Sequence, residues 1–198
     1  MKVILIDLGG VLVDVVSSRR LGELIGGHMT PDEVSRRWAQ SESLRLFESG
    51  LCDRDTFAVA AIRELNLDIT QEKFLDEFAL FLKGLYPGAA ELLRSIPVDY
   101  ALACLTDTNA LQWDSLCERF SIDKYFRHHF LSYRIGCVKP DARVYRHVID
   151  HLGCDPGEIV YFDDNAANIE AGLAAGLGAH RVVGVAELAH RLRALGIL

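Results

Sequence analysis

Polar side chains that can take part in phosphoryl transfer stand where four apolar runs of the sequence end. The segments are Asp7-Leu8-Gly9-Gly10-Val11, Leu105-Thr106-Asp107-Thr108-Asn109, Val138-Lys139-Pro140-Asp141 and Tyr161-Phe162-Asp163-Asp164-Asn165. Together they offer carboxylates, a hydroxyl group and one lysine. A carboxylate can attack phosphorus, Mg²⁺ prefers hard oxygen ligands, and cationic or neutral donors neutralise phosphoryl oxygens. This combination predicts metal-assisted phosphoryl transfer, provided that the four segments meet at one site.

The apolar runs before these segments have the character of buried strands. Residues 2–8 form an apolar run that ends at a glycine pair, which is typical of a central strand buried on both faces. Similar runs occupy residues 100–105, 158–162 and 180–183, with a weaker one near 129–132. Helical stretches alternate with them at about 109–120, 141–152, 166–176 and 185–195. The alternation predicts an α/β fold with a Rossmann-like, doubly wound parallel sheet whose strand ends converge on one crevice.

The stretch 15–86 interrupts this alternation, because it carries only helical signals. Thr30 begins a capping box, and Asp53 and Thr70 can each cap a following helix. A proline-glycine pair then marks the return to the alternating pattern. We expect two parts: an inserted all-helical cap of residues 15–86 and a Rossmann-like core of residues 1–14 and 87–198.

Composition and charge limit the classes of partner. The chain has 198 residues, half of them apolar, and 21 basic against 28 acidic side chains give a net charge of −7. This acidic balance argues against a nucleic-acid partner, which needs a basic face. The apolar runs are too short for a signal peptide or a membrane-spanning helix. Five cysteines without paired spacing favour reduced thiols. We therefore expect a cytoplasmic protein with no membrane partner, either a monomer or a homodimer.

The four segments, in this order, resemble the four motifs of the haloacid dehalogenase superfamily of hydrolases, over nearly the whole chain. The helical insert is similar to the small all-helical cap of that superfamily. A branch that holds bacterial sugar-phosphate phosphatases, including glucose-1-phosphate phosphatase, has similar runs: Ile6-Asp7-Leu8-Gly9-Gly10-Val11-Leu12-Val13-Asp14, Leu46-Phe47-Glu48-Ser49-Gly50 and Phe162-Asp163-Asp164-Asn165. The resemblance implies a Mg²⁺-dependent phosphatase that acts on a small phosphosugar-like metabolite.

The same resemblance implies a role for each matching residue. Asp7 would be the nucleophile that forms an aspartyl-phosphate intermediate. Thr106 would hydrogen-bond the transferring phosphoryl group, and Lys139 would pair with both Asp7 and the phosphoryl oxygens. Asp107 is expected to bind substrate beside Thr106 and Lys139, and Thr108 stays an alternative to Thr106.

A Mg²⁺ site is implied as well. Asp164 would bind the ion directly, together with Asp7 and the backbone carbonyl of Gly9. Asp163 would complete this metal-binding group, more from behind than as a direct ligand, and Asn168 is a further supporting candidate. Two adjacent acids at the end of an apolar strand repel each other without a cation. This repulsion favours a metal site over the alternative that the acids only cap the next helix.

Gly9 departs from the superfamily pattern, because most of its phosphatases have a second aspartate at this position. That aspartate protonates the leaving group and later activates water, a contribution of roughly a hundred- to ten-thousand-fold in rate. Asp14 and Asp107 are candidate substitutes. Two alternatives stay open: a 2-haloacid dehalogenase, which uses the same nucleophile on carbon without a metal, and a catalytically weak or silent member that binds a phosphorylated ligand. The adjacent acids Asp163 and Asp164 count against the dehalogenase.

Four conspicuous side chains lie in the expected cap: Arg36, Arg37, Trp38 and Arg45. They could contact the substrate. A solvated helical face is the commoner explanation for such a charged stretch, and we interpret them in this way.

Overall fold

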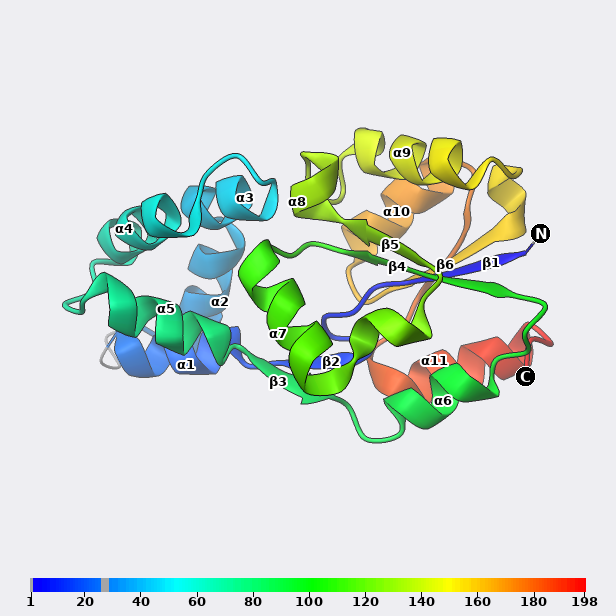
Figure 1. The fold of residues 1–198 in the computed structure, drawn as a ribbon, viewed down its shortest axis with the longest axis horizontal. Coiled ribbons are helices and arrows are strands. Elements are labelled where there is room, and N and C mark those ends of the chain that lie inside the picture. The colour runs from blue at the N-terminus through cyan, green and yellow to red at the C-terminus, as the bar shows by residue number, and fades with distance from the viewer. Residues whose placement is uncertain (1, 26–28) are drawn as a thin grey trace.

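The computed structural model describes residues 2–25 and 29–198. Residue 1 of the expected core and residues 26–28 of the expected cap lie outside this part. Figure 1 shows an α/β core on the right and a group of helices on the left, with β2 and β3 running between them. Within the described ranges, no helix is both long and apolar enough to cross a membrane.

A five-stranded parallel sheet forms the centre of the core, in the order β5-β4-β1-β6-β7. Its strands are β1 (Val3–Ile6), β4 (Ala101–Thr106), β5 (His128–Leu131), β6 (Ile159–Asp163) and β7 (Gly178–Arg181). β1 lies in the middle, between β4 and β6, because its side chains are apolar on both faces. The predicted doubly wound α/β fold is confirmed, although β7 lies two residues before its expected position.

Helices cover both faces of the sheet. Successive side chains of β1 point to opposite faces and are all apolar, so each face needs helices to bury them. Val3 and Leu5 pack on one face, whereas Ile4 and Ile6 pack on the other. The first face carries α9 (Ala142–Leu152) and α10 (Ala166–Ala174). The second carries α6 (Ala89–Ser95), α7 (Ala110–Phe120) and α11 (Gly184–Ala194). Short elements complete the core: η1 (Ile122–Tyr125), α8 (Ser132–Ile135) and η2 (Pro156–Glu158).

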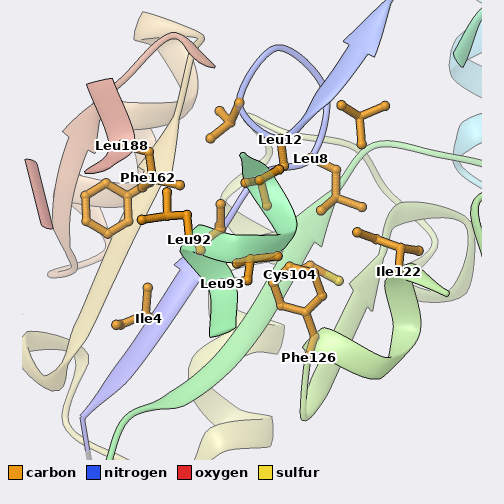
Figure 2. Close-up of a cluster of buried hydrophobic side chains, with 14 of the residues drawn as sticks. Ile4, Leu8, Leu12, Leu92, Leu93, Cys104, Ile122, Phe126, Phe162 and Leu188 are labelled. Carbon is orange, nitrogen blue, oxygen red and sulfur yellow. The ribbon is translucent and has the colours of Figure 1, made fainter. Parts of the chain in front are cut away.

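The apolar cluster on the second face fixes the three central strands relative to one another. Figure 2 shows Ile4, Cys104 and Phe162, which come from β1, β4 and β6. Leu92 of α6 and Leu188 of α11 pack against the same cluster. Full burial of one such large apolar side chain contributes about 1.5–3 kcal/mol. The packing thereby sets the positions of the strand ends, where the polar segments begin.

The inserted helices, here called the helical cap, have an apolar core of their own. They are α1 (Ser17–Leu24), α2 (Pro31–Ala39), α3 (Glu42–Glu48), α4 (Arg54–Leu65) and α5 (Gln71–Ala79). The expected N-caps Thr30, Asp53 and Thr70 are confirmed, because each side chain accepts a hydrogen bond from a first-turn amide. Aromatic side chains dominate the buried cluster, among them Trp38, Phe47, Phe57, Phe74, Phe78 and Phe81.

Two short strands pair where the chain enters and leaves the helical cap. β2 (Val13–Val15) and β3 (Leu82–Leu85) run antiparallel and form a two-stranded ribbon. The expectation that the stretch 15–86 holds only helices is therefore wrong at both ends. Strands this short have no readable period, and each depends on a partner far along the sequence. The ribbon ties the two crossings between core and cap together (Figure 1).

Candidate active site

The carboxyl ends of β1, β4 and β6 bring three expected side chains to one crevice. Asp7 follows β1 directly, Thr106 is the last residue of β4, and Asp163 is the last residue of β6. The Asp7 amide donates to the Phe162 carbonyl at 2.9 Å, which continues the pairing of β1 and β6 beyond the end of β1. Residues far apart in the sequence thus meet at one edge of the sheet.

Lys139 lies among these residues and is almost completely buried. Its Nζ donates to Asp7 Oδ1 and Asp163 Oδ2, both at 2.8 Å, and to the Leu105 carbonyl at 3.2 Å. Burial by itself would lower the pKa of Lys139, but the charges of Asp7 and neighbouring groups hold that pKa well above its ordinary value. Lys139 therefore stays protonated near neutral pH, between the two aspartates.

Asp7 has the expected contact with Lys139, but its burial is costly. Burial raises the pKa of Asp7 to about 8, while Lys139 opposes the rise and Asp163 adds to it. Full ionisation of Asp7 near neutral pH therefore requires positive charge beyond the Lys139 ammonium.

Asp163 is fully buried, and donors surround both of its oxygens. Oδ2 accepts hydrogen bonds from the Lys139 ammonium and the Tyr161 hydroxyl. Asn168 Nδ2 lies 3.1 Å from each oxygen, and the Asn165 amide donates to Oδ1 at 2.8 Å. So many donors leave little capacity for a metal ion. The contacts favour a supporting role for Asp163 and bring Asn168 to the position expected of a supporting residue.

Asp164 differs, because among the described residues only its own backbone amide donates a hydrogen bond to its carboxylate. It is half-buried, and burial followed by the charge of Asp163 raises its pKa. The backbone of Gly10 lies directly against the Asp164 carboxylate and has a left-handed conformation, with φ 71°. A Cβ at Gly10 would come 2.4 Å from Asp164 Oδ2, so glycine is required for the two segments to approach.

The negative charge of this edge fits a hard divalent cation, with Asp7 and Asp164 as the acids free to bind it and Asp163 behind them. Asp7, Asp163 and Asp164 each present an oxygen within 4.8 Å of the others. Gly9 lines the same cavity, so its backbone is near the acids as expected. Oxygen ligands and excess negative charge are the combination that Mg²⁺ prefers. The residues present therefore fit the expected metal.

The loop after β4 lines the cavity with Thr106, Asp107 and Thr108. The Thr106 hydroxyl lies 3.4 Å from the Asp107 carbonyl, a long contact that leaves it available to another acceptor. Asp107 Oδ1 accepts the Lys139 backbone amide at 3.0 Å, and burial raises the pKa of Asp107. Ser132 bonds both the amide and the carbonyl of Thr108, at 2.8 and 3.0 Å. Both threonines thus reach the cavity, as expected of either candidate.

The cavity has a volume of about 250 Å³, and the helical cap closes part of it. Trp38 lines it and is only 8% exposed, so the interpretation of Trp38 as part of a solvated face is wrong. It is buried because α2 turns its apolar face toward the other aromatic rings of the cap. Arg36 and Arg37 are exposed, as expected. Arg45 is exposed too, but it lines an adjoining hollow of about 760 Å³.

Sequence reasoning misses one acidic side chain of the site. Glu48, the last residue of α3, lines both the cavity and the adjoining hollow. Of the two suggested substitutes for the missing aspartate, Asp107 lines the cavity. Asp14 instead pairs with Lys83 at 3.1 Å in the ribbon and is not among the described lining residues. Glu48 belongs to the run 46–50, which is part of the family resemblance. The acid in that run was the only sequence signal for a site residue there.

Known proteins that resemble this chain include a flavin mononucleotide hydrolase and a phosphatase. Flavin mononucleotide hydrolase 1 of Arabidopsis thaliana is 28% identical over 155 residues. That match covers 76% of this chain and 61% of the relative, so this chain spans less than two thirds of that protein. A phosphorylated carbohydrates phosphatase of Thermotoga maritima is 27% identical over 195 residues, which cover 93% of this chain and 85% of the relative.

Solved structures share the fold. A haloacid dehalogenase family enzyme of Bacteroides thetaiotaomicron, in complex with magnesium, matches with a TM-score of 0.81 at 21% identity over 98% of both chains. The L-2-haloacid dehalogenase of Xanthobacter autotrophicus matches with a TM-score of 0.71 at 19% identity, over 99% of this chain and 83% of that one. The family model of haloacid dehalogenase-like hydrolases matches residues 1–176. This chain therefore belongs to the haloacid dehalogenase-like hydrolases.

Proposed function

We propose that this hydrolase is a Mg²⁺-dependent phosphatase that acts on a small phosphosugar-like monoester through an aspartyl-phosphate intermediate. The observation that carries the proposal is the cluster of Asp7, Asp163 and Asp164 beside the Lys139 ammonium. In the described part of the chain, one buried ammonium contacts two of these three carboxylates, Asp7 and Asp163, and a divalent cation would offset the remaining negative charge. A dehalogenase acts without a metal, so this excess charge favours the phosphatase.

The side chains of the crevice would divide the work of phosphoryl transfer. Lys139 holds Oδ1 of Asp7, which leaves the other oxygen for attack on phosphorus. Lys139 and the Thr106 hydroxyl then neutralise the phosphoryl oxygens as the bond to the leaving oxygen breaks. A bound Mg²⁺, held by Asp164, Asp7 and the Gly9 carbonyl, would supply positive charge that reduces repulsion between the phosphate and the acids.

The size of the cavity supports a small substrate. Its volume of about 250 Å³ lies below the range of roughly 300–1,000 Å³ that is usual for small-molecule sites. The cavity therefore suits a phosphate group with a compact attachment, and the adjoining hollow offers room for the remainder. The relative that is named for phosphorylated carbohydrates supports the same substrate class.

Gly9 favours a second candidate, a family member that binds a phosphorylated ligand and turns it over slowly or not at all. A glycine leaves no side chain at the position from which a general acid would act. Such a member would still be stabilised by its ligand, because binding to the folded state alone raises stability.

The test is phosphate release from p-nitrophenyl phosphate and from a panel of sugar phosphates, with Mg²⁺ and with EDTA. We expect metal-dependent release that Asp7→Asn abolishes. Asp99→Asn, the same change at an exposed site, should leave the rate unchanged. Absence of phosphate release from every ester would overturn the proposal. Thermal stabilisation by the esters without turnover would then identify the binding member, and halide release from 2-haloacids would identify a dehalogenase.

A further inference from the structure

The proposed reaction needs a group that moves protons, and Gly9 has no side chain to do so. We propose that Glu48 of the helical cap protonates the leaving oxygen and then deprotonates the attacking water. This inference rests on the proposed phosphatase function.

Glu48 lines the part of the site where a leaving group would lie. It lines the cavity together with Asp7, Asp107 and Lys139, and the charges of these three residues act on its carboxyl group. It also lines the adjoining hollow, so it lies where the phosphoryl cavity and the larger space meet. Among the described residues, none donates a hydrogen bond to the Glu48 carboxylate or forms an ion pair with it. The carboxyl group is therefore free to exchange protons with a substrate.

Contacts at both ends of α3 hold this acid in position. Past the C-terminal end, Gly50 has φ 67° and lies so close to α8 that a Cβ would come 2.3 Å from the Tyr133 carbonyl oxygen. Figure 1 shows the same approach of α3 to α8. At the N-terminal end, the hydroxyls of Ser41 and Ser43 donate to Glu64 of α4, at 2.9 and 2.6 Å. The last residue of α3 is thus fixed relative to both the cap and the core.

The surroundings of Glu48 favour its protonated form near neutral pH. Burial raises the pKa of Glu48 to about 8, with Asp107 adding to the rise and Lys139 opposing it. A general acid is most effective when its pKa lies near the working pH. The alternatives are less suitable, because Asp107 is tied to the Lys139 amide and Asp14 lies in the ribbon.

The proton transfers balance over one turnover. In the first step Asp7 forms a bond to phosphorus, the bond from phosphorus to the leaving oxygen breaks, and the Glu48 carboxyl gives its proton to that oxygen. The products are the aspartyl phosphate, an alcohol and the Glu48 carboxylate. In the second step a water oxygen attacks phosphorus, Glu48 takes a proton from that water, and Asp7 leaves as a carboxylate. Inorganic phosphate is released and the Glu48 carboxyl is restored.

Glu48→Gln tests this assignment, because glutamine keeps the shape but cannot exchange the proton. The test compares sugar phosphates, whose alkoxide leaving groups need an acid, with p-nitrophenyl phosphate, whose phenolate does not. We expect kcat on the sugar phosphate to fall by roughly a hundred- to ten-thousand-fold. With p-nitrophenyl phosphate we expect a rapid burst of one p-nitrophenol per enzyme, followed by slow turnover, because the second step lacks its base. Glu72→Gln, an exposed acid of the cap, is the matched control.

Three results would overturn the assignment. One is an unchanged kcat on sugar phosphates, and another is a rise in KM alone, which would make Glu48 a binding residue. The third is an equal loss in the burst and in steady turnover, which would place its effect on the attack by Asp7 and not on proton transfer. Each is measured against an active wild-type enzyme, so failure of the assignment is distinct from failure of the phosphatase function. Thermal unfolding of both variants verifies that they fold.

Discussion

Replacement of Lys139 by methionine should destabilise the protein by about 3–5 kcal/mol at pH 8 in EDTA, the usual cost of breaking a buried ion pair. Methionine keeps most of the buried aliphatic chain but removes the ammonium that lies 2.8 Å from Asp7 and from Asp163. The two aspartate side chains are only 9% and 0% exposed, so water screens them little. The loss is therefore expected from uncompensated buried charge and not from a cavity.

The loss should be smaller at pH 7 than at pH 9, because Asp7 ionises above about pH 8 in the wild type and only at higher pH in the variant. Burial raises the pKa of Asp7 to about 8 even beside Lys139, and removal of the ammonium raises it further. A carboxylate whose folded pKa exceeds its unfolded pKa binds more protons in the folded state, so stability falls as the pH rises between the two values. Each such proton contributes at most about 1.4 kcal/mol per pH unit. Lys139, with its raised pKa, stays charged throughout this range in the wild type.

Urea unfolding at pH 7, 8 and 9 measures both effects, in EDTA and with Mg²⁺. A metal that binds only the folded state adds about 2.7 kcal/mol at a hundred times its Kd, so Mg²⁺ should offset part of the loss. Lys124→Met, at an exposed position, is the control. A loss below about 1 kcal/mol at pH 8, the size of an exposed ion pair, would refute the reasoning. So would a loss that is the same at pH 7 and pH 9.

Three further changes test other parts of the structure. Tyr161→Phe should cost about 1–3 kcal/mol in urea unfolding, since Asp163 loses a buried hydroxyl donor; an unchanged midpoint would contradict this. Gly10→Ala should weaken Mg²⁺ binding by roughly 10- to 100-fold in calorimetry, because its Cβ would displace the Asp164 carboxylate; an unchanged affinity would show that Asp164 does not hold the metal. His128→Asn should reduce the pH dependence of stability between pH 5 and 7. Burial, followed by a neighbouring histidine, lowers the pKa of His128, so the unfolded wild type binds more protons and stability falls below about pH 6.5; parallel profiles for variant and wild type would exclude this.

Sequence and structure agree where the environment of a residue is set by its close neighbours in the chain. The run Val3–Ile6 is apolar at every position, so it predicts a strand buried on both faces without knowledge of its partners. The last strand shows the limit of this reasoning. The apolar pair Val182 and Val183 led to the prediction of a strand over residues 180–183. In the structure, Val182 is buried beyond the end of the strand, and Val183 is the N-cap residue of α11. The strand itself starts at Gly178, because pairing with β6 fixes its register.

Features that depend on distant contacts were not predictable from the chain. β2 and β3 become strands only because residues 13–15 meet residues 82–85. The same limit applies to Glu48 and Asp14 in the candidate site. Asp14 is near Asp7 in sequence, yet β2 carries it to Lys83. Glu48 is far from Asp7 in sequence, yet the docking of the cap on the core brings it to the cavity.

The strand order has a consequence for synthesis of the chain. β1 is the middle strand of the sheet and the first to leave the ribosome, but both of its neighbours are made much later. Until β4 (Ala101–Thr106) and β6 (Ile159–Asp163) emerge, the apolar run Val3–Ile6 has no sheet partner. Pairing between such distant segments is slow, and an unpaired apolar strand is prone to self-association. Products that terminate before β6 should therefore aggregate, because one edge of β1 would stay open in every copy.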